Sequence, residues 1–94
     1  MASFIPPEKI SEIQRSINII DIVSDYIALK QSGKNFLGLC PFHHEKTPSF
    51  TVNEEKQIYK CFGCGEGGTV FNFLMKQESL TFPEAINVLA EKTN

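Results

Sequence analysis

The fold of this chain is decided by residues 40–64, which read CPFHHEKTPSFTVNEEKQIYKCFGC. Both ends of the segment carry a pair of potential metal ligands, and two residues separate the members of each pair. Sulfur and nitrogen ligands in two such short loops, here called the first and second knuckles, are typical of tetrahedral Zn²⁺. The spacing therefore predicts one Zn²⁺ ion bound by Cys40, His43, Cys61 and Cys64.

Each knuckle needs a tight turn, because two ligands three positions apart can share an ion only if the backbone folds back between them. Pro41 favours such a turn in the first knuckle, and Gly63 and Gly65 favour it in the second. The residues before each knuckle have the pattern of a strand, so each knuckle is expected at a hairpin tip. This arrangement is a zinc ribbon.

The fourth ligand has two candidates, because His43 and His44 are neighbours and only one can complete the tetrahedron. His43 reproduces the spacing of the second knuckle and is the predicted ligand, whereas His44 is left without a role.

Two other interpretations of the cysteines are weaker. A redox motif at Cys61 and Cys64 would be followed by a helix, and glycines follow instead. Simple burial of the cysteines as small apolar side chains does not explain two paired knuckles.

Four protein ligands close the coordination sphere, so the zinc is predicted to be structural and no catalytic residue is assigned.

The bulk composition agrees with one small globular domain: the chain has 94 residues, of which 41% are hydrophobic and 21% charged. Three cysteines fit a disulfide framework poorly. The start of the chain has neither a basic segment nor a long apolar run, so a cytoplasmic protein without membrane contact is expected.

The net charge of −2 is unevenly distributed along the chain. Residues 27–62 contain five lysines and three glutamates, which gives +2, and the remainder contains four cations and eight carboxylates, which gives −4. This basic tendency is mild and does not by itself establish nucleic-acid binding.

The predicted fold class is α+β, a zinc ribbon flanked by N- and C-terminal helices in a single domain over residues 1–94. Helices are expected in residues 1–26. Pro6 and Pro7 can begin the first helix and are followed by isoleucines at helical spacing, and Asn18 is the predicted N-cap of the second helix. The ribbon sheet is expected over residues 27–67, and helices return over residues 68–94. Two short strands are predicted to meet in a turn at Ser32–Gly33, and a second pair is predicted at Ser49–Val52 and Gln57–Lys60. The last two helices are predicted to have Thr69 and Thr81 as their N-caps. The glycine-rich residues 61–68 are expected to be neither strand nor helix.

The segments CPFHHEKTPSF (40–50) and YKCFGCGEGGTVFNFLM (59–75) resemble the N-terminal zinc-binding domain of bacterial-type replicative DNA primases. The likeness extends over almost the whole chain, and the Cys-His-Cys-Cys set together with EKTPSF makes it specific. One position departs from the family pattern: Thr69 stands where an aspartate usually follows the paired glycines.

The resemblance implies a function in DNA replication. Such primases are nucleotidyltransferases that synthesise short RNA primers on single-stranded DNA, and this domain helps recognise the initiation site. It is expected to engage the template for the polymerase domain of the same or a neighbouring molecule. The polymerase domain and the part that contacts the replicative helicase are expected outside this segment, so the chain alone should not be catalytic.

Single-stranded DNA requires cations for its phosphates and flat rings for its bases. The position of Phe62 favours base stacking over core packing, because it lies between two ligands with little room for burial, whereas Tyr59 suits either stacking or the core. The residues predicted to contact the template are Lys30, Lys34, Lys46, Pro48, Ser49, Lys56, Tyr59, Lys60 and Phe62. The alternative for each lysine is a solvated sheet face. The alternative for the whole chain is a structural zinc ribbon that makes protein–protein contacts through its acidic helices.

Overall fold

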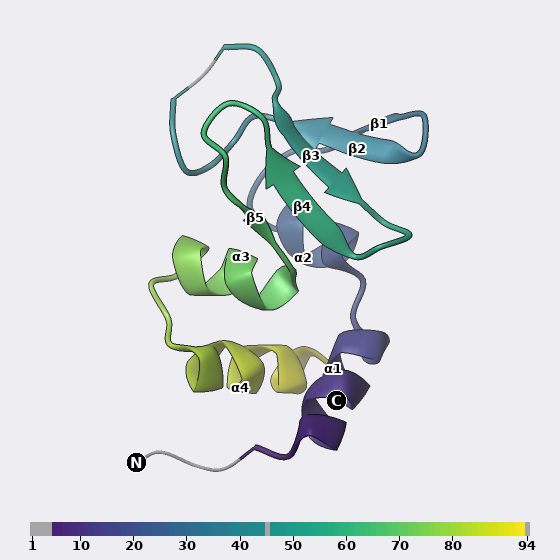
Figure 1. Cartoon of the computed structure of the whole chain (residues 1–94), viewed down its shortest axis with the longest axis vertical. Coiled ribbons are helices and arrows are strands. Elements are labelled where there is room, and N and C mark those ends of the chain that lie inside the picture. The colour runs from purple at the N-terminus through teal and green to yellow at the C-terminus, as the bar shows by residue number, and fades with distance from the viewer. Residues whose placement is uncertain (1–4, 45, 94) are drawn as a thin grey trace.

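The computed structural model describes residues 5–44 and 46–93, with side chains described up to residue 92. Over these residues an antiparallel sheet lies at one end of the molecule and the helices lie below it (Figure 1), which confirms the predicted α+β class. The elements are α1 (Pro7–Ser16), α2 (Ile19–Ser24), β1 (Lys30–Ser32), β2 (Asn35–Gly38), β3 (Phe50–Asn53), β4 (Ile58–Cys61), β5 (Gly67–Gly68), α3 (Val70–Gln77) and α4 (Phe82–Thr93).

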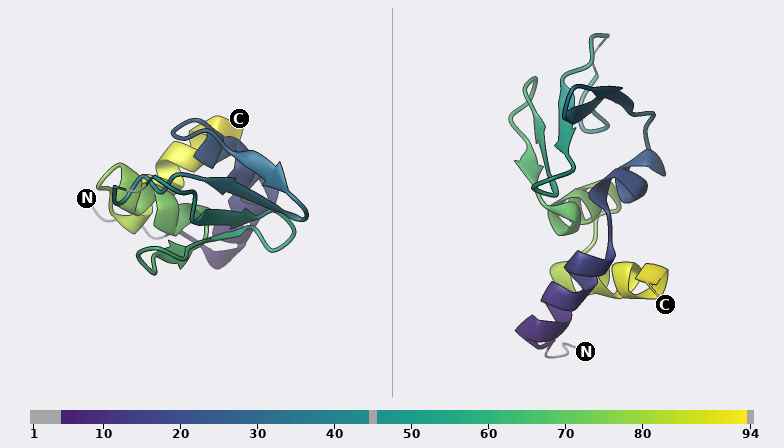
Figure 2. Two further views of the ribbon diagram at one scale, coloured as in Figure 1. Left: turned by 90° about the horizontal axis from the view of Figure 1, so that it is seen from above. Right: turned by 90° about the vertical axis from the view of Figure 1, so that its right-hand side faces the viewer.

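The sheet is a meander in which each strand pairs with its neighbours in chain order, β1-β2-β3-β4-β5. Residues that lie directly opposite one another point to the same face of the sheet. The pair Val52↔Tyr59 is buried on the inner face, which packs against α3, whereas the pair Thr51↔Lys60 lies on the other side, here called the outer face. The sheet therefore separates a buried side from a side open to solvent (Figure 2).

The inner face is held by a cluster of aromatic rings around Phe73 of α3. The Phe73 ring lies 6.0 Å from Phe50 and 5.7 Å from Tyr59, and Phe50 and Tyr59 stack at 5.3 Å between centroids. Phe50 and Phe73 are both fully buried. Such offset and edge-to-face pairs contribute about 0.5–1.5 kcal/mol each beyond their buried area. This cluster joins the strands that carry the metal ligands to the helical half of the molecule.

The helix starts follow the predicted capping residues. Asn18 Oδ1 accepts a hydrogen bond from the Ile20 N–H (3.0 Å), and Thr81 and Glu84 form a reciprocal capping box (2.8 and 3.3 Å). Thr69 precedes α3, and its backbone N–H donates to Asn72 Oδ1 (2.9 Å). Threonine thus begins this helix without the carboxylate that the family pattern usually places there.

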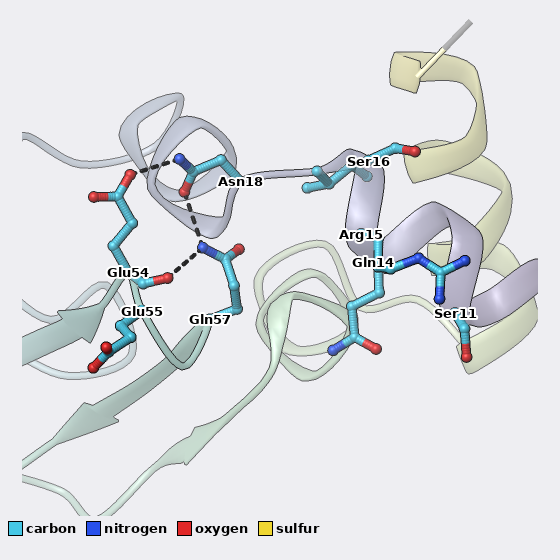
Figure 3. Close-up of a pocket in the computed structure, with 9 residues that line it drawn as sticks. Ser11, Gln14, Arg15, Ser16, Asn18, Glu54, Glu55 and Gln57 are labelled. Carbon is cyan, nitrogen blue, oxygen red and sulfur yellow. Dashed lines mark hydrogen bonds between the residues drawn. The ribbon is translucent and has the colours of Figure 1, made fainter.

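One set of hydrogen bonds between distant segments was not predicted from the sequence. Gln57, in the β3–β4 turn with φ of 56°, accepts from the Ile19 N–H through Oε1 (2.7 Å) and donates to Asn18 Oδ1 (3.3 Å). The Asn18 amide in turn donates to Glu54 Oε2 (2.7 Å), as Figure 3 shows. The turn therefore completes the N-terminus of α2 and fixes that helix against the sheet.

Three expectations about the strands were wrong in detail. The first turn is Gly33–Lys34, with Gly33 in the left-handed region at φ 63°, and β3 and β4 each begin one residue later than predicted. The glycine-rich segment is also not free of strand structure, because Gly67–Gly68 forms β5 against Lys60 and Tyr59. None of the helices over residues 5–44 and 46–93 has the length and apolar character needed to cross a bilayer.

Candidate metal centre

The two knuckles lie side by side because each occupies the loop of a hairpin in the same sheet. The first knuckle is in the β2–β3 connection, and the second begins at the last residue of β4 and continues into the loop before β5. The backbone N–H of Phe62 donates to the Ser49 carbonyl (3.0 Å), which ties the second knuckle to the residue before β3. The sheet register therefore brings together ligands that are about twenty residues apart in the chain.

The four predicted ligand side chains converge on one point. The ligand atoms of Cys40, His43, Cys61 and Cys64 all lie within 4.8 Å of one another. The Sγ atoms of Cys40 and Cys64 are 3.8 Å apart, and Cys61 Sγ is 4.0 Å from His43 Nδ1. A tetrahedral Zn²⁺ with Zn–S bonds of about 2.3 Å has sulfur–sulfur edges of ~3.8 Å. The four residues are therefore positioned to bind one zinc ion.

The choice between the adjacent histidines follows from their placement. His43 belongs to this group, whereas His44 is exposed and outside it. His43 also closes the set at four protein ligands, which is the pattern of a structural zinc site and leaves no open position for substrate.

The thiols of the cluster have unequal acidity. Burial raises the pKa of the Cys40 thiol to about 12, against a smaller lowering effect of the Phe42 N–H. Burial also acts to raise the pKa of Cys61, but hydrogen bonds from the Ser49 hydroxyl and from the backbone N–H groups of Cys64 and Gly63 outweigh it, and the net pKa falls to about 7. Several thiolates this close repel one another unless a cation lies between them, so the chemistry of the donor set fits a divalent metal.

The glycines of the second knuckle have two different functions, and this corrects the prediction that both supply unusual dihedral angles. Gly65 does so, with φ of 84°. Gly63 instead provides space, because a Cβ there would lie 2.8 Å from Ser49 Oγ and 2.9 Å from His43 Nε2. The second knuckle thus accommodates the imidazole of the first.

The lysines predicted to contact the template all remain accessible. Lys30 and Lys60 lie on strands with their side chains exposed, Lys34 and Lys56 lie in turns, and Lys46 lies in the loop after the first knuckle. Within the described part of the chain, the ion pairs are Lys9–Glu12, Lys76–Glu66 and Lys92–Asp25, and none includes these five lysines. Their template contacts stay a prediction.

The other predicted contacts divide into two groups. Phe62 is 72% exposed at the end of the outer face, and Pro48 is exposed in the loop before β3. Tyr59 was predicted wrongly as a candidate contact: its ring is 3% exposed and lies in the aromatic cluster, where burial raises its pKa to about 12. Ser49 is half-buried, with its hydroxyl 3.5 Å from Cys61 Sγ, so its observed contact is with the metal ligands.

The outer face also carries polar residues that the sequence reasoning missed. Asn35, Thr51 and Asn53 lie beside Lys60 and Phe62 around a shallow depression. The alternation of Thr51 and Asn53 with buried Phe50 and Val52 was the available signal, but the register of β2 against β3 was needed to bring Asn35 and Asn53 together.

Comparisons with known proteins agree with this centre. The CHC2 zinc finger family matches residues 5–94. The chain is 56% identical over 91 residues to a DNA primase of Enterococcus faecalis and 53% identical over 90 residues to one of Halalkalibacterium halodurans, covering 97% and 96% of this chain. It spans only 14% and 15% of the length of those relatives. Among solved structures, the zinc-binding and RNA polymerase domains of the Aquifex aeolicus primase match with a TM-score of 0.87 and 42% identity, over 99% of this chain and 22% of that one.

Proposed function

The chain belongs to the CHC2 zinc finger family of DNA primases, and from this premise we propose that it is the module that binds the single-stranded template when an RNA primer is started. The zinc holds the two knuckles together, and the knuckles border the outer face of the sheet. The template would lie across that face, with its phosphates near the lysines and its bases against exposed side chains. The polymerase activity would reside in another part of the primase.

The observation that carries this proposal is the exposure of Phe62. An aromatic ring that is 72% exposed on a short metal-bound loop gains little for folding. Its neighbours on the outer face are the lysine Lys60 and the apolar Ile58, which is 38% exposed. A rigid ring beside a cation is the combination that binds unpaired bases and their phosphates, and each stacked base contributes about 1–3 kcal/mol.

The proposed protein partner is the RNA polymerase domain of the same or a neighbouring primase molecule. The Aquifex aeolicus structure contains both kinds of domain, which supports placing the two activities in one protein. The replicative helicase would be contacted by a part of the primase outside this chain, and that contact stays a prediction.

The test is a fluorescence anisotropy titration of the zinc-loaded chain with short single-stranded DNA at low salt. Phe62→Ala should weaken binding by about fivefold or more, because it removes one stacking surface. The matched control is Phe82→Ala, which truncates another exposed ring (40%) at the start of α4, away from the sheet. Equal affinity of the wild type and the Phe62 variant for single strands would contradict the proposed interface, and saturable binding to a polymerase domain without DNA binding would favour protein–protein contacts instead.

A further inference from the structure

The outer face is hollowed by a small pocket of about 170 Å³ between β2, β3 and β4. Its polar lining comes from Asn35, Thr51, Asn53 and Lys60, and its apolar lining comes mainly from Ile58 and Phe62. Pockets that enclose whole drug-sized molecules are about 300–1,000 Å³, so this one is suited to a smaller planar group.

A single backbone group fixes the orientation of both asparagine amides. The Lys56 N–H donates to one amide atom of Asn53 (2.8 Å), which must therefore be the oxygen Oδ1. The opposite amide atom of Asn53 is then Nδ2, and it donates to Asn35 Oδ1 (3.1 Å). The amide nitrogen of Asn35 consequently keeps both hydrogens for another partner, and that of Asn53 keeps one. No hydrogen bond from these hydrogens occurs within residues 5–44 and 46–93.

Other groups around the pocket reinforce this excess of donors. The Lys60 ammonium group can only donate, and the Thr51 hydroxyl next to it can donate or accept. The acidic residues of the adjoining turn, Glu54 and Glu55, line a different pocket at the α1–α2 junction together with Gln14 and Arg15 (Figure 3). The pocket on the outer face is therefore rich in hydrogen-bond donors and is not lined by a carboxylate.

We propose that this pocket binds one unpaired base of the template through an exocyclic carbonyl oxygen, with Asn35 as the residue that determines base preference. This inference rests on the proposed function. The free Asn35 amide N–H groups would donate to the carbonyl, while Phe62 and Ile58 contact the ring. Thymine, cytosine and guanine carry such an oxygen and adenine does not, so the pocket disfavours adenine.

The experiment compares short oligo(dT), oligo(dA) and abasic strands of equal length, titrated into the zinc-loaded ¹⁵N-labelled chain. We expect oligo(dT) to bind about three- to tenfold more tightly than oligo(dA), the range of one or two net hydrogen bonds. We also expect the side-chain amide signals of Asn35 and Asn53 to shift with oligo(dT) and not with the abasic strand. Asn35→Leu keeps the size and charge of the side chain but removes the donors, so it should abolish the preference and leave abasic-strand affinity unchanged. Asn87→Leu, at an exposed position of α4, is the matched control.

The outcomes separate this inference from the proposed function. Binding of single strands without a dT preference, or with a preference that survives Asn35→Leu, would overturn the base pocket and leave the template interface standing. Absence of any single-strand binding by the wild type would overturn both. A preference that disappears in Asn35→Leu but persists in Asn87→Leu would support both, and Asn35→Asp should then favour oligo(dA), because its carboxylate accepts from the adenine amino group.

Discussion

The two knuckles have the same ligand spacing but place their phenylalanines on opposite sides of the sheet. Phe42, in the first knuckle, is half-buried and lies 5.7 Å from Phe73 and 6.1 Å from Phe50, and the Lys76 Nζ atom lies 5.6 Å from its ring centroid. Phe62, in the second knuckle, has none of these contacts and is 72% exposed.

This difference assigns different physical tasks to the two loops. The first knuckle is anchored to α3 through its ring, so it contributes to the hydrophobic core as well as to the metal site. The second knuckle is held by the metal and by the β4–β5 pairing, and its ring is available for a ligand. Stability should therefore respond most to changes in the first knuckle and nucleic-acid affinity to changes in the second.

The largest effect is expected from removal of the zinc ion, because both knuckles bind it. Structural zinc contributes an apparent ~10–16 kcal/mol in small zinc domains, and a typical domain has a total stability of ~5–15 kcal/mol. Exhaustive chelation should therefore unfold the sheet, seen as lost amide protection and full thiol reactivity of the three cysteines. His43→Ala should lower zinc stoichiometry in the same way, and His44→Ala should leave it at one. A chain that keeps its protected amides after chelation would show that the metal is dispensable.

The second prediction compares the two rings directly. Phe42→Ala should destabilise the zinc-loaded chain by about 3 kcal/mol, the low end for a core phenylalanine, since the ring is half-buried. Phe62→Ala should change stability by no more than about 0.5 kcal/mol. Urea unfolding at one fixed free zinc concentration measures both, because bound metal adds to apparent stability. Equal losses in the two variants would mean that the second ring also packs in solution.

The third prediction separates the two glycines of the second knuckle. Gly63→Ala would force the new methyl group against the His43 ring, so zinc affinity should fall by about 1–3 kcal/mol, as for other overpacked sites. Gly65→Ala has no atom within 4 Å of its new Cβ but keeps a left-handed backbone, so it should cost about 1 kcal/mol of stability and little zinc affinity. Competition with a chromogenic chelator measures the first effect, and identical zinc affinities in the two variants would refute the distinction.

Local patterns were sufficient to predict the metal ligands and the starts of the capped helices. Ligand spacing identified the group that includes His43, and capping residues such as Asn18 and Thr81 marked the helix starts, because these features depend on residues only a few positions apart. What failed was the function assigned to Tyr59, since an aromatic residue before a metal ligand suits either face until the packing of α3 is known.

Features that join distant segments could not be predicted in this way. The Asn35–Asn53 pair depends on the register of β2 against β3, and Gln57 reaches Ile19 across the molecule. The need for glycine at position 63 arises from the imidazole of the other knuckle. Each requires the three-dimensional fold, because no local sequence rule relates the partners.

The smallest expected effect is on the salt dependence of single-strand binding, and it tests whether the template crosses one knuckle or both. Lys46 follows the first knuckle and Lys60 precedes the second, and both are exposed. Each phosphate contact on a single strand contributes about 0.7 to the slope of log affinity against log salt. Lys60→Ala and Lys46→Ala should each flatten that slope by about 0.7 if the strand passes both loops, whereas a path over the second knuckle alone requires a change only in Lys60→Ala. Lys92→Ala, on α4 beside Asp25, is the matched control and should leave the slope unchanged. Wild-type slopes in both the Lys46 and Lys60 variants would place the phosphates elsewhere, and the exposed ring of the second knuckle would then have to bind bases without help from these two cations.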